Sequence, residues 1–258
     1  MIDTNVHLFQ WPFRRLAADD PAELAKRLQE RGVTEAWAGS FEALLCRDVS
    51  GVNARLADGC RRYGENFLVP FGCVNPNMPD WEEDLRRCHE EYGMPGIRVY
   101  PNYHGYSVGS AGFAQLLSLA ERTGMAVQIA LSMEDIRTQF PLMVVPPTDP
   151  APLAESIAKY PRLKLMMLNA GYWTDERRTE IDPLRKARNV YFDIAMNEGI
   201  GGLVRLRKAT APERVVFGSH HPFFYFESAL LKVRSAGLPH DEEAALLEEN
   251  ARAFLGRG

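Results

Sequence analysis

Short apolar runs and longer amphipathic segments alternate along the whole chain. Eight runs have the apolar, β-branched character of strands, and a helix-like segment follows each one. The runs are residues 1–8, 33–40, 67–75, 96–101, 125–131, 163–171, 190–195 and 214–222. Most are apolar without alternation, as in a parallel sheet that is covered on both faces. Eight such units predict a (β/α)8 TIM barrel in a single domain over residues 1–258, with an extra C-terminal helix at residues 241–256. A doubly wound open sheet is the alternative, although no GxGxxG turn follows the first run.

Composition narrows the class of protein. The chain has 258 residues, of which 46% are hydrophobic and 25% charged, as in ordinary globular domains. A net charge of −4 argues against nucleic acid as a partner, and no apolar run is long enough to span a bilayer. Acidic Asp3 comes at once, with no basic and apolar leader, so we expect a cytoplasmic protein. The cysteines, which form no CxxC pair and are expected as reduced thiols, are Cys46, Cys60, Cys73 and Cys88.

Polar side chains stand at the C-terminal ends of the predicted strands, where a barrel carries its active site. Because strand side chains alternate, Asp3, Asn5 and His7 share one face, which must be the barrel interior if they are to find partners. The last strand ends in "GSHHP", and the same alternation sends either His220 or His221 inward. The other strand ends contribute Ser40, Glu42, Asn75, Arg98, Tyr100, Gln128, Asn169, Tyr172, Trp173, Asp193 and Asn197.

Five stretches of the chain, in order, resemble motifs of the amidohydrolase superfamily. "IDTNVHL" resembles its first-strand D-x-H-x-H, and "GMAVQIAL" its fifth strand, which usually ends in histidine. "PRLKLMMLNAG" resembles its sixth strand, "VVFGSHHPF" its eighth-strand G-S-D-x-P, and "LEENARAFLG" its closing helix. The chain is similar to the amidohydrolase-related group that includes aminocarboxymuconate-semialdehyde decarboxylase-like and 2-pyrone-4,6-dicarboxylate lactonase-like enzymes. The resemblance implies a (β/α)8 barrel that hydrolyses amides or lactones, or decarboxylates, usually with one divalent metal. Because such relatives are often dimers or larger, it also implies a homo-oligomer.

The same alignment indicates that the family's metal ligands have changed. The two first-strand histidine positions hold Asn5 and His7, the fifth-strand histidine is Ala130, and the sixth-strand histidine is Asn169. The eighth-strand aspartate, which in the family binds metal and activates water, is His220. Neutral amide oxygens are weak ligands for zinc. The resemblance therefore allows at most a weak zinc or manganese site built from His7, His220, Asn169 and Asn5, and the ligand types favour a metal that is absent or loosely held.

Two functions are consistent with these residues. In the first, the chain is a hydrolase or decarboxylase for a small carboxylated or cyclic carbonyl compound, and His7, His220 and Asn169 carry the chemistry. The expected substrate-binding residues are Asn5, Arg98, Tyr100, Tyr172 and Trp173. Arg98 is read either as a fork for a substrate carboxylate or as an internal ion-pair partner of Asp3 or Asp193.

In the second function, the barrel is catalytically silent and serves as a module that binds a small molecule or a partner. The loss of four of the five ligand positions favours this interpretation. The polar character of most of the replacements favours the enzyme.

Overall fold

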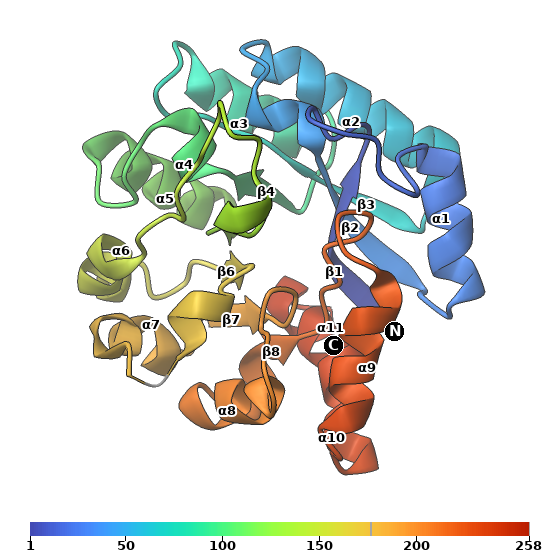
Figure 1. The fold of residues 1–258 in the computed structure, drawn as a ribbon. Helices are drawn as coiled ribbons and strands as arrows, with labels where there is room; N and C mark the ends of the chain where they lie inside the picture. Colours follow the sequence, from blue (N-terminus) through green and yellow to red (C-terminus); the bar gives the residue numbers. More distant parts are fainter. Residues whose placement is uncertain (176, 258) are drawn as a thin grey trace.

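The computed structural model of the chain describes residues 1–175 and 177–257. Eight parallel strands pair in sequence order and curve into a barrel, with helices around the outside (Figure 1). The strands are β1 (Ile2–Leu8), β2 (Glu35–Ser40), β3 (Leu68–Gly72), β4 (Gly96–Val99), β5 (Ala126–Ala130), β6 (Leu165–Leu168), β7 (Val190–Asp193) and β8 (Val215–Val216). The predicted barrel is therefore confirmed. The open doubly wound alternative is wrong, because the strand order never reverses.

The connections between strands carry the helices. They are α1 (Pro21–Glu30), α2 (Val49–Gly64), α3 (Trp81–Glu90), α4 (Pro101–His104), α5 (Ala111–Thr123), α6 (Ala151–Ser156), α7 (Asp182–Lys186), α8 (Gly202–Ala209), α9 (Phe226–Ser235), α10 (His240–Ala244) and α11 (Asn250–Leu255). A π-helical turn at Ala245–Glu249 joins α10 to α11, so the predicted C-terminal helix is one continuous element. Within the described residues, no helix combines the length and apolar character needed to cross a membrane.

The barrel closes through irregular backbone after β8. That strand has only two residues, yet the chain beyond it continues to bond to β1. The Thr4 amide donates to the Phe217 carbonyl at 3.0 Å, the His220 amide to Asn5 at 2.8 Å, and the His7 amide to His221 at 3.0 Å. The closing seam therefore sets His220 beside the end of β1.

The barrel interior has three levels. The apolar base is sealed by the C-terminal helix, since Phe254 packs on Trp37 at 5.8 Å and on Tyr191 at 5.0 Å between ring centroids. The middle level is polar and buried, and consists of Asp3, Asn5, His7, Arg98, Gln128 and Asp193. The upper level is aromatic and apolar, and its members include Trp11, Phe41, Tyr100, Ala130 and Met133. Polar groups are thus held between two apolar layers, away from bulk water.

Candidate active site

The residues from the ligand positions meet in the middle level of the barrel. Asn5 and His7 come from β1, and Asn169 and His220 lie just beyond β6 and β8. None of the four is more than 2% exposed. Asn169 and His220 have left-handed backbone angles, with φ of 56° and 58°. Such angles are uncommon outside glycine, although asparagine and histidine tolerate them better than bulky residues do, and they gather at functional sites.

A network of amides and one carboxylate ties three strands together. Asn5 Nδ2 donates to Asn169 Oδ1 at 2.9 Å and to Asp193 Oδ2 at 2.7 Å. The other Asp193 oxygen accepts from the Asn169 backbone amide at 2.9 Å, and Asn169 Nδ2 donates to the Ser132 carbonyl at 2.7 Å. Both amide groups are therefore fixed in orientation, and the Asp193 carboxylate is bound on both of its oxygens.

Arg98 lies at the centre of this level with its guanidinium fully buried. Its nitrogens donate to the carbonyls of Val6 at 2.7 Å, Trp37 at 3.0 Å and Thr4 at 3.2 Å, and to Gln128 Oε1 at 2.8 Å. Among the described residues, no carboxylate lies within ion-pair distance of it. The expectation of a direct internal ion pair to Asp3 or Asp193 is therefore wrong. The positive charge is held by oxygen dipoles instead.

Space for this guanidinium comes from a glycine. A Cβ at Gly39, on β2, would lie 2.8 Å from the Tyr100 hydroxyl and 2.9 Å from Arg98 Nη1. The Tyr100 phenol is buried beside Arg98, and burial raises its pKa well above the ordinary value. Tyr100 thus lies in the predicted site, as a neutral group next to a cation.

The two histidines have opposite tautomers. His220 Nε2 lies 2.7 Å from the Met133 carbonyl, so it carries the proton and donates, which leaves Nδ1 as an acceptor. His7 Nε2 lies 3.3 Å from Arg98 Nη1, a donor, so that Nε2 accepts and Nδ1 carries the proton. Neither Nδ1 atom has a hydrogen-bond partner among the described residues. The ring centroids are 5.3 Å apart, so the ring with the unused donor and the ring with the unused acceptor are neighbours.

Burial keeps both imidazoles uncharged near neutral pH. It lowers the pKa of His220 to about 4. Burial, reinforced by the positive Arg98 and by His220, holds the pKa of His7 well below its ordinary value of 6.5. Burial also raises the pKa of Asp193 to about 6, although its hydrogen bonds from Asn5 and Asn169 oppose the shift. Burial raises the pKa of Asp3 to about 6 as well, so at neutral pH the level holds neutral rings beside a cationic arginine and two mostly ionised aspartates.

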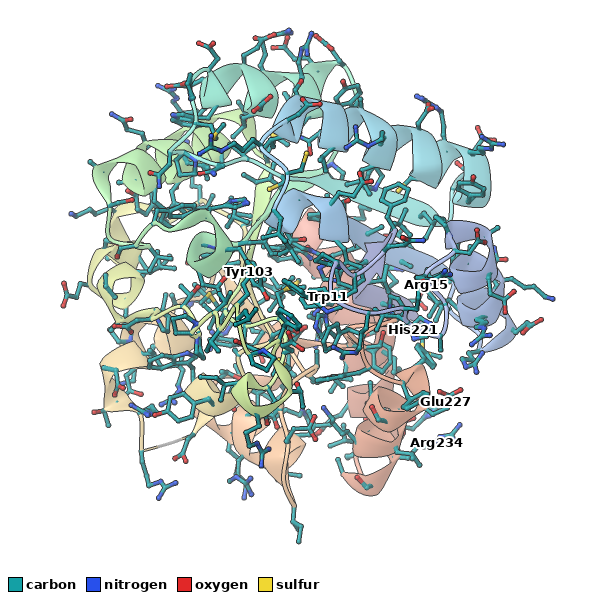
Figure 2. All side chains as sticks on the ribbon, turned by 45° about the horizontal axis from the view of Figure 1, so that its top comes forward. Trp11, Arg15, Tyr103, His221, Glu227 and Arg234 are labelled. Atoms are coloured by element: carbon teal, nitrogen blue, oxygen red, sulfur yellow. The ribbon has the colours of Figure 1, made fainter. Side chains whose placement is uncertain are left out.

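An aromatic roof covers the histidines. His7 stacks on Phe41 with ring centroids 4.7 Å apart, and His220 stacks on Phe223 at 5.2 Å. Trp11 bridges them, at 5.3 Å from Phe41 and 4.9 Å from Phe223. Figure 2 places Trp11 near the middle of the molecule. A ligand can reach the imidazoles only if this roof opens.

Two of the candidate residues lie away from the central level. Tyr172 and Trp173 are on the 3-10 turn Gly171–Thr174 after β6, where they pack edge to face at 5.2 Å. Arg178 lies over Tyr172 at 4.0 Å, and Tyr172 is 62% exposed. The role of Tyr172 and Trp173 in substrate binding stays a prediction.

His220 is the inward member of the histidine pair, because its ring lies 5.3 Å from that of His7, whereas His221 Nδ1 lies 3.2 Å from the Phe224 carbonyl.

Comparison with known proteins identifies the family. The sequence model of the family described as "Amidohydrolase" matches residues 2–257. The chain belongs to the amidohydrolase family. Among curated protein sequences, none matches this chain.

Solved amidohydrolase-fold structures are similar over the full length. Crystallised 5-carboxyvanillate decarboxylase from Sphingomonas paucimobilis is 14% identical with a TM-score of 0.77, covering 99% of this chain and 98% of that one. The enzyme of the same name from Novosphingobium aromaticivorans, described in complex with manganese, is 14% identical with a TM-score of 0.71, covering 99% and 95%. A probable 2-pyrone-4,6-dicarboxylic acid hydrolase from Acinetobacter baumannii is 13% identical with a TM-score of 0.68, covering 99% and 98%. At this identity the likeness establishes the barrel fold.

The donor set of this amidohydrolase does not fit a divalent metal. The ring nitrogen of His7 and the side-chain oxygen of Asn5 both face Arg98 Nη1, at 3.3 and 3.5 Å, so a dication there would stand against a guanidinium. The Asn169 oxygen is already occupied by Asn5. In the described part of the chain, no three His, Cys, Asp or Glu side chains are grouped so that they could hold a metal ion.

Sequence reasoning missed the groups that complete the site. Gln128 and Asp193 were identified at strand ends. A single sequence contains no sign that Gln128 binds Arg98 or that Asp193 binds the two asparagines. The roof residue Phe41 follows β2 directly, and its aromatic character is the only signal for it. The Met133 carbonyl, which sets the His220 tautomer, is a backbone atom and leaves no mark on the sequence.

Proposed function

We propose that this amidohydrolase is a metal-independent enzyme that hydrolyses a small cyclic or carboxylated carbonyl compound. The observation that supports it most is the pair of buried Nδ1 atoms, a donor on His7 and an acceptor on His220, on neighbouring rings whose centroids are 5.3 Å apart. A buried polar atom without a partner costs roughly 1–3 kcal/mol, and a bound carbonyl and water would satisfy both atoms.

The proposed reaction uses neutral imidazoles. Water gives a proton to His220 Nδ1 as its oxygen attacks the carbonyl carbon, and His7 Nδ1–H donates to the developing oxyanion. When the intermediate collapses, the C–O bond of the ring breaks and the leaving oxygen takes the proton from His220. Arg98 supplies a fixed positive charge nearby. Asn5 and Asn169, which bond each other and the Ser132 and Asp193 oxygens, hold the strand ends around the two rings in place.

The test is turnover in chelator-treated protein. The substrates are a panel of γ- and δ-lactones, aryl esters and carboxylated aromatic acids. Hydrolysis is measured by the release of protons, and decarboxylation by the release of carbon dioxide. His220→Asn suits the left-handed backbone at this position and removes the base. We expect it to lower turnover roughly 100- to 10,000-fold. His221→Asn is the matched control and should retain activity. Full activity in His220→Asn contradicts the proposal.

Metal analysis tests the other half of the proposal. Protein supplied with manganese or zinc and then desalted should hold far less than one metal per chain, because His7 Nε2 and the Asn5 oxygen face Arg98, the Asn169 oxygen is occupied, and the described residues group no three His, Cys, Asp or Glu side chains. One tightly bound metal per chain, with turnover lost on chelation and recovered on its return, would mean that the enzyme is metal-dependent.

The full burial of His7 and His220 beneath the roof favours a second candidate, a catalytically silent binding barrel. It predicts no turnover with any panel member and unchanged ligand binding in His220→Asn. Turnover that depends on His220 separates the two candidates.

A further inference from the structure

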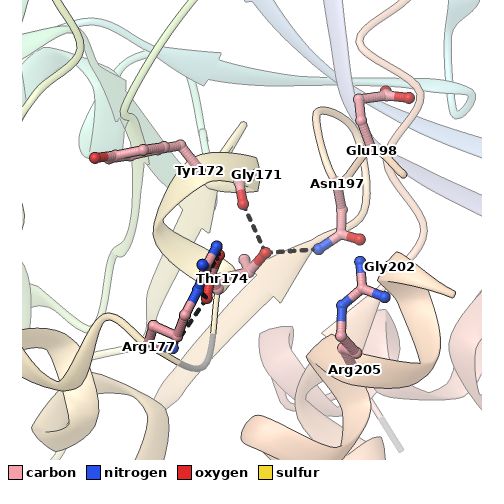
Figure 3. A pocket seen from close by; sticks show the side chains of 9 residues that line it. Gly171, Tyr172, Thr174, Arg177, Asn197, Glu198, Gly202 and Arg205 are labelled. Atoms are coloured by element: carbon pink, nitrogen blue, oxygen red, sulfur yellow. Dashed lines mark hydrogen bonds and ion pairs between the residues drawn. The ribbon is translucent and has the colours of Figure 1, made fainter. Parts of the chain in front are cut away.

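A second polar hollow opens away from the histidine pair. It lies between the loops that follow β6 and β7 and the first turn of α8, and has a volume of about 370 Å³ (Figure 3). Its lining includes Gly171, Thr174, Asn197, Glu198, Gly202 and Arg205. These loops stand at the C-terminal ends of barrel strands, where TIM barrels bind ligands.

Two glycines shape this hollow. A Cβ at Gly171 would lie 1.7 Å from the Met196 carbonyl, and one at Gly202 would lie 2.5 Å from Asn197 Oδ1. The turn after β6 therefore approaches the loop after β7 backbone to backbone. The start of α8 approaches the Asn197 amide equally closely. Any side chain at these positions would push the walls apart.

The hollow has a cationic side. Arg205 Nη1 donates to the Ile200 carbonyl, but no carboxylate of the described residues lies within 4.0 Å of the Arg205 guanidinium. Both acids in the wall are paired with other cations, Asp175 with Arg177 in the same wall and Glu198 with Lys232.

The start of α8 adds to this positive potential. The helix begins after Gly201, without a side-chain cap and without an acidic residue in its first turn. An uncapped helix start presents free N–H groups and a partial positive charge. This side of the hollow therefore favours an anion.

Asn197 adds a second requirement. The residue is 4% exposed, and its Nδ2 donates to Thr174 Oγ1 at 2.8 Å. The Thr174 hydroxyl in turn donates to the Gly171 carbonyl at 2.7 Å, so the amide cannot be reversed without losing a bond. Asn197 Oδ1 is left as a buried acceptor without a partner among the described residues (Figure 3). A ligand that fits must bring a hydrogen-bond donor.

We propose that this hollow binds a small oxyanion that carries its own hydroxyl group, as a hydrogen phosphate or a hydroxycarboxylate does. The anionic oxygens face Arg205 and the start of α8, and the O–H donates to Asn197 Oδ1. Sulfate and simple carboxylates have the charge but lack the donor. The proposal stands apart from the histidine chemistry and can fail without affecting it.

Calorimetric titration at constant ionic strength and about pH 6.5, where phosphate retains an O–H, tests it. The probes form two pairs, phosphate with sulfate and glycolate with acetate. We expect at least one hydroxyl-bearing probe to bind roughly tenfold more tightly than its partner, the worth of one hydrogen bond to a charged ligand. The pair that shows the difference identifies the source of the hydroxyl. Binding of none of the four, or equal binding within both pairs, overturns the proposal.

Variants locate the site. Arg205→Gln should weaken the preferred probe about tenfold, and Arg205→Lys should recover part of that loss. Arg234→Gln, an exposed arginine on α9, is the matched control and should bind as the parent does. Asn197→Ala should abolish the preference within the pair while charge-driven binding persists. Equal weakening by Arg205→Gln and Arg234→Gln places the anion elsewhere and contradicts the proposal.

Discussion

Arg98 places a positive charge beside Asn5 and His7, two of the positions where the family has metal ligands. The sequence allowed a fork for a substrate carboxylate or an ion pair with Asp3 or Asp193. The ion pair is absent, and the guanidinium binds backbone oxygens of β1 and β2. One of these oxygens, that of Thr4, lies where the pairing of β1 with β2 shifts register, between Asp3 and Val6. The Thr4 carbonyl in that irregular stretch accepts from both Arg98 and Gln128, at 3.2 and 3.0 Å. A bulge of this kind redirects backbone groups, and the residue types in the stretch do not predict it.

Replacing Arg98 should therefore lower the stability of the fold even when the new residue has the same charge. Arg98→Lys keeps the cation but has three donors on a point charge, so several buried carbonyls lose their partners. We expect the free energy of unfolding to fall by about 3 kcal/mol, measured by urea denaturation. Arg122→Lys, on α5, is the control and should change it by less than about 0.5 kcal/mol. A loss as small as the control's would mean that the carbonyls are satisfied without the guanidinium.

At the scale of elements, the helices with strong local signals were predictable. Asp20 Oδ1 accepts from the Glu23 amide at 3.0 Å, Pro21 is the first residue of α1, and Gly32 follows its end with φ of 80°, and these residue types are typical of those positions. The end of β8 was not predictable. Its run "VVFGSHHP" looks long, but the regular strand ends at Val216 and the chain turns at His220 with φ of 58°. Tertiary bonds to β1 hold that turn, and local propensity contains no trace of them.

Two aspartates allow a test of helix capping. Asp20 precedes α1 and makes a capping bond, whereas Asp80 precedes α3 with φ of 58° and makes none. Asp20→Ala should lower the free energy of unfolding by about 1 kcal/mol. Asp80→Asn, which tolerates the same backbone angle, should change it by less than about 0.5 kcal/mol. Equal losses in thermal or urea unfolding would mean that helix-dipole charge, and not the capping bond, sets the stability of α1.

At the scale of the whole molecule, the barrel and its family were readable from eight ordered units and five motifs. The inward polar face of β1 was readable as well, because alternation is a local property. What the barrel mouth contains was not readable. The roof, the tautomers and the guanidinium at the centre depend on which strands face each other across the barrel. A single sequence does not encode those distances in any one segment.

The buried charges make stability depend on pH in opposing ways. His7 and His220 have lowered pKa values, so below pH 6.5 their side chains bind protons in the unfolded chain but not in the folded chain. Their contribution therefore lowers the free energy of unfolding as pH falls below 6.5. Asp3 and Asp193 have pKa values raised to about 6, so the folded chain binds their protons first, and stability rises as pH falls from 6 toward 3.8. The two effects partly cancel in the native protein.

Removing one histidine should expose this balance. In His220→Asn, the destabilising contribution of His220 at low pH is gone, while the stabilising contribution of the aspartates remains. As pH falls from about 6 to 5, the free energy of unfolding of the variant should therefore rise relative to that of the parent by about 1 kcal/mol per pH unit. Urea unfolding at several pH values measures both curves. His89→Asn, an exposed histidine on α3, should run parallel to the parent. Parallel curves for His220→Asn would mean that His220 takes up its proton equally in the folded and unfolded chain, and the roof would then have to admit water freely.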